Sequence, residues 1–321
     1  TKSLGVMFDL KNEGKHHVSY IKKKGAEWTS KLNSAVHIGR SDAWCSFMFQ
    51  LEPSLAYSLE TLSANPTSLE KAQRNIFFKS LSRLGVNQHI IETVRQLPRK
   101  YGGLNMFDLN VKMLGAKLHY LRTYWGTKSE ERNHLQGMYE DFRMDIGLGG
   151  NVFARDYVKY EYLAKHSRFK HLWHLCHMFK CELSIDFPPF VQQQREGDRA
   201  MMDVFLDSGL YSRDTLKVLN RVRRFKKVHL LSDILCADGK TVNPCMLSPS
   251  AGASTREFSL EKPTRGNKKK WNDALHDITS TQHTLETPLS KYLTMPHNDV
   301  GWYATSDEKS LFHLCRDGDY D

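Results

Sequence analysis

The chain has 321 residues, of which 40% are hydrophobic and 11% aromatic, so it can form a buried core and is not a disordered polar chain. Its formal net charge of +10 favours polyanionic partners, among which nucleic acid is the commonest. Scattered cysteines without a CxxC pair, no long apolar run and no leader-like start argue against a disulfide scaffold, a membrane span and secretion. We therefore expect an intracellular protein, of the nucleus or cytoplasm, with no membrane partner.

The first predicted elements are a short strand and a basic helix. Alternation of Leu4, Val6 and Phe8 with more polar residues predicts a strand within the first ten residues. Residues 20–36 have apolar side chains at helical spacing, which predicts an amphipathic helix with a basic outer side. Its three consecutive lysines are candidate phosphate contacts: Lys22, Lys23 and Lys24.

Two further helices carry start and stop signals. The first begins at the Ser-Asp pair that opens with Ser41 and is predicted to stop at Pro53, because proline interrupts helical hydrogen bonding. The second is predicted to begin with a capping box of Thr67 and Glu70 and to end at Gly85.

The segment PRKYGGL follows a short predicted helix over residues 88–97. A glycine-rich phosphate loop follows a strand, whereas this segment lies between two predicted helices. We therefore interpret it as a sharp helix-to-helix turn in which Gly102 and Gly103 allow a positive φ or a close backbone approach. Arg99 and Lys100 in the same turn are candidate phosphate contacts.

The rest of the chain also has mainly helical patterns. Helices are predicted over residues 108–126, 129–146, 153–164, 168–182, 196–208, 212–226 and 268–279. From residue 228 onward the sequence pattern is less helical. It predicts a DG turn at 238–239, a loop rich in Pro, Gly, Ser and Thr, and a terminal hairpin within 299–315. We expect a mainly α chain: a helical bundle over 1–150, a helical extension over 151–227 and a small mixed α/β region over 228–321.

The densest basic segment is RDTLKVLNRVRRFKK, residues 213–227, which holds seven basic residues and one acidic residue. Such a helix suits contacts with backbone phosphates, which position a nucleic acid without reading its sequence. A basic helix that serves solubility alone is the alternative, as it is for the lysine tract at 268–270. The candidate contacts in the segment are Arg221, Arg223, Arg224, Lys226 and Lys227.

Candidate catalytic and metal-binding residues are few. His174, His177 and Cys181 stand at i, i+3 and i+7, so one helix could direct them toward one metal ion, and a metal hydrolase built on them is one hypothesis. Lys170 shares their side of the helix and no fourth ligand is identifiable, so we predict no metal site. Motifs of nucleophilic, zinc-protease and nucleotide-binding sites are absent, and we predict no catalytic residue.

The segment LPRKYGGLNMFDL, with LGV at residues 4–6 and EPSLAYSL at 52–59, resembles the region after the catalytic palm in reverse transcriptases of non-LTR, LINE-like retroelements. Order and spacing agree over residues 1–126. The resemblance implies a thumb-like helical domain with a C-terminal extension. It also implies two partners, an RNA–DNA template–primer and an upstream palm of the same polypeptide.

The chain departs from that family in its catalytic residues. None of its residues matches the [YF]xDD motif or the first catalytic aspartate, so polymerase activity is not carried over, and Mg²⁺ is expected only with the palm. A decayed or domesticated remnant that acts as a protein-interaction scaffold is the alternative. Four aromatic residues are candidates for stacking on bases or for core packing: Tyr101, Tyr120, Tyr124 and Trp125.

Overall fold

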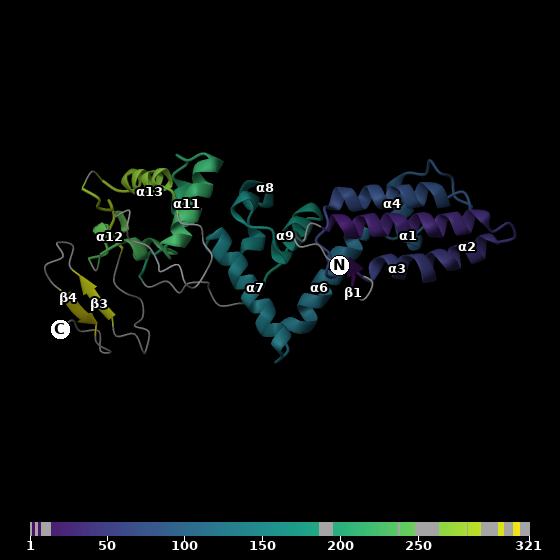
Figure 1. The fold of residues 1–321 in the computed structure, drawn as a ribbon, viewed down its shortest axis with the longest axis horizontal. Coiled ribbons are helices and arrows are strands. Elements are labelled where there is room, and N and C mark those ends of the chain that lie inside the picture. The colour runs from purple at the N-terminus through teal and green to yellow at the C-terminus, as the bar shows by residue number, and fades with distance from the viewer. Residues whose placement is uncertain are drawn as a thin grey trace. The chain divides into compact units, whose positions relative to one another are not determined.

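The structure is a computed structural model whose chain divides into two compact units, which are described one at a time (Figure 1). Unit 1 comprises Thr1–Met138 and His166–Cys181, and unit 2 comprises Tyr139–Lys165 and Glu182–Asp321. The described residues are 14–185, 195–236, 238–247, 263–280, 282–289 and, for the backbone alone, 2–3, 6–7, 301–304 and 311–314.

In its described residues, unit 1 is helical apart from two very short strands. Its strands β1 (Lys2–Ser3) and β2 (Val6–Met7) pair antiparallel, with Lys2 opposite Met7. Its helical elements are α1 (Lys15–Ser34), α2 (Arg40–Ser46), the π-helical turn η1 (Phe47–Leu51), α3 (Glu52–Ala56), α4 (Pro66–Ser80), α5 (Glu92–Gln96), the 3-10 turn η2 (Arg99–Tyr101), α6 (Leu109–Trp125) and α9 (Arg168–Met178). The division between the units falls inside α7 (Glu130–Ile146).

The core of unit 1 forms where α1 and α4 lie side by side (Figure 1). Gly25 permits this approach, because an added Cβ there would overlap the side chain of Ile76. Next to this contact, Phe47 stacks on Phe107 with ring centroids 5.1 Å apart, and Phe77 meets Phe107 edge to face at 5.2 Å. These buried aromatic rings join η1 and α4 to the segment that precedes α6.

The helix predicted to stop at Pro53 instead continues to Ala56, so that prediction is wrong. The π-helical turn just before the proline explains the continuation, since the N–H of Glu52 donates to the carbonyl of Phe47, five residues back. A wider turn of this kind makes room for a proline ring that a regular α-helix interior would exclude. The predicted start of the next helix is also corrected: α4 begins at Pro66, and the side chain of Asn65, rather than that of Thr67, caps it.

The PRKYGGL segment is a sharp turn between α5 and α6, as predicted. Gly102 has φ +81°, and an added Cβ at Gly103 would overlap the carbonyl of Leu97. The chain then folds back on α5, with the N–H of Leu104 donating to the Val94 carbonyl at 3.0 Å. One glycine therefore supplies the positive φ and the other the close backbone approach.

In its described residues, unit 2 consists mainly of short helical elements. These are η3 (Val152–Ala154), α8 (Tyr157–Tyr160), η4 (Glu161–Leu163), α10 (Met201–Asp207), α11 (Arg213–Phe225), η5 (Leu231–Ile234), α12 (Pro244–Leu247) and α13 (Arg265–Asp277). The backbones of β3 (Gly301–Ala304) and β4 (Leu311–Leu314) pair antiparallel within the region predicted to form a hairpin. The predicted DG turn is present, with Gly239 at φ +66°.

The prediction of a mainly α chain is confirmed, whereas the division of the chain differs from the predicted one. The predicted helix over 153–164 is broken into η3, α8 and η4, and the one expected from 196 begins at Met201. The first segment of unit 1 ends at Met138 rather than at residue 150, and unit 1 also includes His166–Cys181, because α9 packs on α6. Contacts distant in sequence thus set the boundary.

Candidate nucleic-acid interface

Helix α11 carries a basic stripe on one face. Arg213, Lys217, Arg221 and Arg224 follow one another at spacings of four, four and three, and the first three are exposed. Because an α-helix turns by about 100° per residue, this spacing keeps the four side chains within about 80° of one another, on one side of the helix. The opposite side is buried through Leu216, Leu219, Val222 and Phe225.

Acidic and aromatic neighbours hold part of the stripe in place. The Lys217 ammonium lies 3.3 Å from Asp214, and the Arg224 guanidinium lies 2.7 Å from Asp145. The Arg213 guanidinium is 5.6 Å from the centre of the Tyr162 ring. The stripe is therefore positioned, and its net charge is lower than its sequence suggests.

Helix α13 brings the lysine tract at 268–270 next to α11. The Tyr211 hydroxyl, just before α11, lies 3.2 Å from both the Ala274 carbonyl and the Asp277 carboxylate near the end of α13. Where α11 ends, burial and then the charge of Lys268 lower the pKa of Lys226. The two helices are therefore antiparallel, and the end of α11 lies beside the start of α13.

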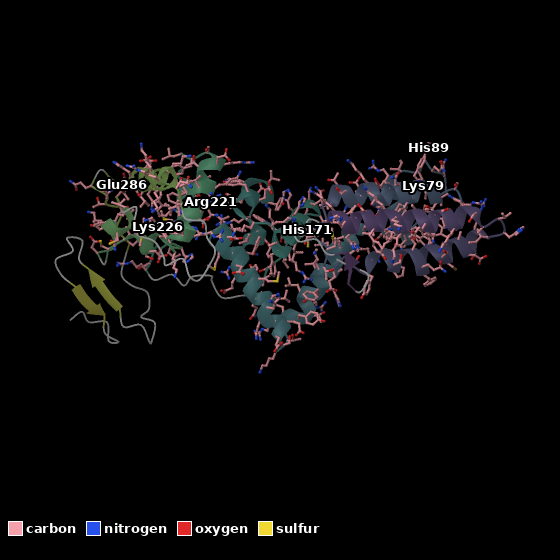
Figure 2. The ribbon with its side chains drawn as sticks, viewed as in Figure 1. Lys79, His89, His171, Arg221, Lys226 and Glu286 are labelled. Carbon is pink, nitrogen blue, oxygen red and sulfur yellow. The ribbon has the colours of Figure 1, made fainter. Side chains whose placement is uncertain are left out.

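We call this meeting point the basic corner. It comprises Lys226, Lys227, Arg265, Lys268, Lys269 and Lys270, of which Lys227, Arg265, Lys269 and Lys270 are exposed. Figure 2 shows Arg221 and Lys226 in this part of unit 2. Trp271 anchors α13 from the buried side, meeting Phe205 edge to face at 5.6 Å. Two basic segments predicted separately thus meet where these two helices pack together.

Arg223 was predicted to contact phosphate, and the structure corrects that prediction, because its side chain is 0% exposed. Its guanidinium donates to the carbonyls of Met144 at 2.6 Å and Val228 at 3.1 Å, and to the Asn220 side chain at 2.9 Å. The Met144 carbonyl belongs to the last turn of α7, where backbone acceptors have no helical partner and a cation is favourable. Arg223 therefore holds the end of α7.

Burial, and then the charge of Arg224, lowers the pKa of Arg223 to about 9, so the guanidinium stays charged at neutral pH. Gly147, at φ +70°, follows α7, and an added Cβ there would overlap this guanidinium. The sequence held a signal for the buried position. Leu216, Leu219 and Arg223 are spaced by three and four, which places the arginine on the apolar side of α11.

Lys226 was also a predicted phosphate contact, and it is only 8% exposed. Its backbone N–H donates to the Val222 carbonyl at 2.9 Å as α11 ends. Lys227 follows in the left-handed region at φ +58° and is exposed. Of this pair, Lys227 is the residue whose side chain a phosphate can reach.

The candidate contacts of unit 1 lie on two separate elements. Lys22 and Lys23 are exposed on α1, while Lys24 is half-buried and donates to the Ser54 carbonyl at 3.3 Å. Arg99 and Lys100 are exposed in η2. Among the described residues, no hydrogen bond, ion pair or ring contact joins the two groups.

The four aromatic candidates for stacking differ in exposure. Tyr101 is exposed, and the Lys100 ammonium lies 4.7 Å from the centre of its ring. Tyr120 is half-buried beneath the Arg168 guanidinium at 4.0 Å and beside Tyr124, with ring centroids 4.6 Å apart. Trp125 is likewise half-buried. Tyr101 is thus the residue of this group that presents its ring to solvent.

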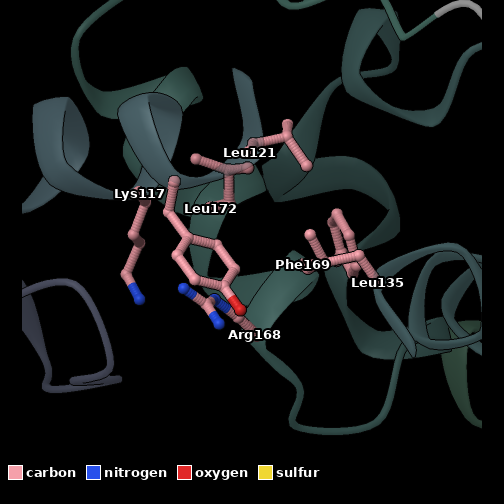
Figure 3. A pocket seen from close by; sticks show the side chains of 7 residues that line it. Lys117, Leu121, Leu135, Arg168, Phe169 and Leu172 are labelled. Atoms are coloured by element: carbon pink, nitrogen blue, oxygen red, sulfur yellow. The ribbon is translucent and has the colours of Figure 1, made fainter. Parts of the chain in front are cut away.

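Unit 1 also contains a largely buried cluster of basic side chains that sequence reasoning missed, of which Figure 3 shows Lys117 and Arg168. Lys117 of α6 is 2% exposed and donates to the Glu60 carbonyl at 3.1 Å, and Arg168 of α9 donates to the same carbonyl at 3.3 Å. His171, one turn along α9, bonds to the Ala64 carbonyl at 2.7 Å. The three side chains hold the loop between α3 and α4.

Burial, and then the neighbouring charge of Arg168, lowers the pKa of Lys117 to about 7, so the ammonium can lose its proton near neutrality. Burial, and then the charge of Lys117, lowers the pKa of His171 to about 3, which keeps the imidazole neutral. The small cavity beside Lys117 and Arg168 is otherwise lined by apolar and aromatic side chains. The spacing of Asn110, Met113, Leu114 and Lys117 along α6 could have predicted this burial.

The structure does not keep His174, His177 and Cys181 at the helical spacing considered for metal binding. Helix α9 ends at Met178, and Lys180 adopts a left-handed conformation, so Cys181 no longer continues the helical face of His174 and His177. Among the described residues, no group of three or more His, Cys, Asp or Glu side chains could hold a metal ion.

No family model matches the chain, and neither a curated protein nor a solved structure shows significant similarity to it. Within the described part of the chain, no helix has the length and apolar character needed to cross a membrane.

Proposed function

We propose that this chain is the non-catalytic thumb and C-terminal extension of a retroelement reverse transcriptase, and that it binds the backbone of an RNA–DNA template–primer. The observation that supports the proposal is the basic character of unit 2, where the stripe of α11 and the basic corner lie on one pair of contacting helices, α11 and α13. The sequence resemblance over residues 1–126 supplies the biological setting, and an intracellular location in the nucleus or cytoplasm belongs to the same proposal.

The chemistry of the surface suits phosphate better than bases. Arginine and lysine heads on two adjacent helices offer repeated positive charge, which binds a polyanion by releasing its counterions. An RNA–DNA hybrid is recognised by such a surface through shape and charge rather than sequence. We therefore expect binding that tolerates any sequence and weakens steeply with salt.

Catalysis is not part of the proposal. The residues of this chain offer no match to the aspartates that hold Mg²⁺ in the family it resembles. The proposed partners are therefore the template–primer and a palm that supplies those aspartates.

The test is the salt dependence of binding to an RNA–DNA hybrid duplex. We expect replacement of both Lys227 and Lys269 with alanine to reduce the slope of log K against log salt by about two, since each lost phosphate contact removes about one. The matched control replaces Lys71 and Lys79, two exposed lysines of α4, and removes the same charge from unit 1. Its slope is expected to remain within experimental error of the wild type.

Two results would overturn the proposal. The first is no measurable affinity for the hybrid at low salt, which would favour the protein-interaction scaffold. The second is an equal loss of slope in both double variants, which would mean that net charge alone, rather than the basic surface of unit 2, determines binding.

A further inference from the structure

Helix α9 ends in a cap that places two cysteines together. The N–H of Cys181 donates to the carbonyl of Cys176 at 2.8 Å, and the N–H of Lys180 donates to the carbonyl of His177 at 3.2 Å. Lys180, the first of these donors along the chain, has φ +51°. This pair of bonds around a left-handed residue is a Schellman motif, whose two outermost side chains normally contact each other. Here both of those side chains are cysteines.

The separation of the two cysteines suits a disulfide. With ordinary bond lengths, the 2.8 Å backbone hydrogen bond limits the distance between their Cα atoms to about 6.7 Å, inside the roughly 4.4–6.8 Å range of disulfides. The neighbouring Cys181 also helps to raise the pKa of the Cys176 thiol. Both residues are in the thiol form. The cap therefore holds the two free cysteines at a separation that a disulfide can span.

The two thiols differ in access. Cys176 is 2% exposed, and burial raises its pKa to about 12, with the neighbouring Cys181 adding to the effect. Cys181 is half-buried and lies outside the helix, where a solute can reach it. Because Cys176 is buried and its thiolate is disfavoured, Cys181 is the thiol that reacts first with an oxidant.

We propose that Cys176 and Cys181 form a reversible dithiol–disulfide pair whose oxidant is a low-molecular-weight disulfide. The Cys181 thiolate attacks one sulfur of that disulfide, forms a mixed disulfide and releases one thiolate. The Cys176 thiolate then attacks the sulfur of Cys181, which closes the internal disulfide and releases the second thiolate. The protein loses two electrons and two protons, and the small disulfide is reduced to two thiols.

The bond would fix the end of α9. Unit 1 ends at Cys181, so oxidation would lock the cap at the residue from which the chain passes to unit 2. The same helix carries Arg168 and His171, which hold the loop between α3 and α4. In a reducing compartment such a disulfide forms transiently and acts as a signal rather than as a permanent staple. This inference does not depend on nucleic-acid binding.

Oxidation of the full chain in glutathione buffers tests the proposal. Trypsin cleaves after Lys180, so the internal disulfide would join HLWHLCHMFK to CELSIDFPPFVQQQR, a pair that mass spectrometry can quantify. We expect this linked pair to appear at a ratio of oxidised to reduced glutathione roughly tenfold lower than the ratio that modifies the exposed thiol of Cys45, because ring closure is intramolecular. In the oxidised chain, hydrogen exchange at the amides of Lys180 and Cys181 should slow.

Two variants separate the steps. In Cys181→Ser, Cys176 is expected to stay reduced at every ratio, and in Cys176→Ala, Cys181 is expected to stop at the glutathione adduct. If the buried Cys176→Ala variant fails to fold, Cys181→Ser alone decides. The proposal is overturned if the linked pair is absent from the fully oxidised wild type, or if Cys176 is oxidised equally in Cys181→Ser.

Discussion

Each unit buries a basic side chain against backbone carbonyls, but the two units use different residues for it. In unit 2, Arg223 donates to the carbonyls of Met144 and Val228 at 2.6 and 3.1 Å. In unit 1, Lys117 and Arg168 share the carbonyl of Glu60, and no ion pair of either with a carboxylate occurs among the described residues. Both arrangements hold backbone acceptors where the helical or loop pattern leaves them without a partner.

The choice of side chain decides how each arrangement responds to pH. The planar guanidinium of Arg223 serves several acceptors at once, and its pKa of about 9 keeps it charged at neutral pH. The pKa of Lys117 is lowered to about 7, so its charge changes within the physiological range. One unit thus has a constant buried charge and the other a titrating one.

The largest expected effect comes from removing the constant charge. Arg223→Met keeps the apolar stem and leaves the carbonyls of Met144 and Val228 without a donor, so the free energy of unfolding of unit 2 should fall by about 3–5 kcal/mol. Hydrogen exchange measured on peptides of α11 would report the loss. Unchanged protection of that helix would contradict the structural role given to Arg223.

The glycine beside Arg223 should show the next largest effect. Gly147→Ala adds a Cβ that overlaps the guanidinium at φ +70°, and we expect a loss of about 2–3 kcal/mol in the free energy of unfolding. Gly150→Ala is the matched control, since Gly150 has φ +75° with nothing within 4 Å of the added Cβ. The control should lose only about 1 kcal/mol, the cost of the left-handed conformation. Equal losses in urea denaturation would show that Arg223 moves aside freely.

The titrating charge of unit 1 predicts a dependence of stability on pH. Because the folded pKa of Lys117 lies below its ordinary value, the unfolded chain binds more protons above pH 7, and stability rises with pH. From pH 7 to 8.5 the free energy of unfolding of unit 1 should rise by about 1.5 kcal/mol. Urea denaturation of wild type and Lys117→Met at both values measures this, and the variant should lack that increment. A variant with the same increment would exclude Lys117 as its source.

The smallest effect concerns the start of α4, where sequence and structure point to different capping residues. Asn65→Ala should lower the free energy of unfolding by about 1 kcal/mol, because the Asn65 side chain accepts from the N–H of Thr67. Thr67→Ala should change it by only a few tenths of a kcal/mol, as expected for an exposed position inside the first turn. Thermal unfolding of both variants compares them directly. A larger loss of stability for Thr67→Ala than for Asn65→Ala would support the capping box predicted from the sequence.

Local signals predicted local structure well. Asp108 caps α6 through the N–H groups of Asn110 and Val111, as a helix over 108–126 requires, and the glycine turn before it has the predicted character. Pro53 was misread because a proline signal contains no information on the π-helical turn that precedes it. Such a turn depends on the packing of the whole helix.

Contacts between segments that are far apart in the sequence could not be predicted from local sequence patterns. The adjacency of α11 and α13, and the packing of α9 on α6, join segments that no local periodicity relates. The basic corner therefore became visible only in the structure, although both of its basic tracts were identified beforehand. Arg223 illustrates the opposite case, since its charge suggested an exposed ligand while its spacing along α11 indicated burial.

The π-helical turn of unit 1 has a consequence for how related chains should be compared. Ala43, Phe47, Leu51 and Leu55 are all buried at strict intervals of four, a spacing that would drift by about 40° per step around a regular α-helix. The wider turn absorbs the drift, in effect as a one-residue insertion that leaves the buried face intact. We therefore expect divergent homologues to gain or lose a single residue within 47–51 without loss of the fold, so an alignment gap at this point would record a change of helix type.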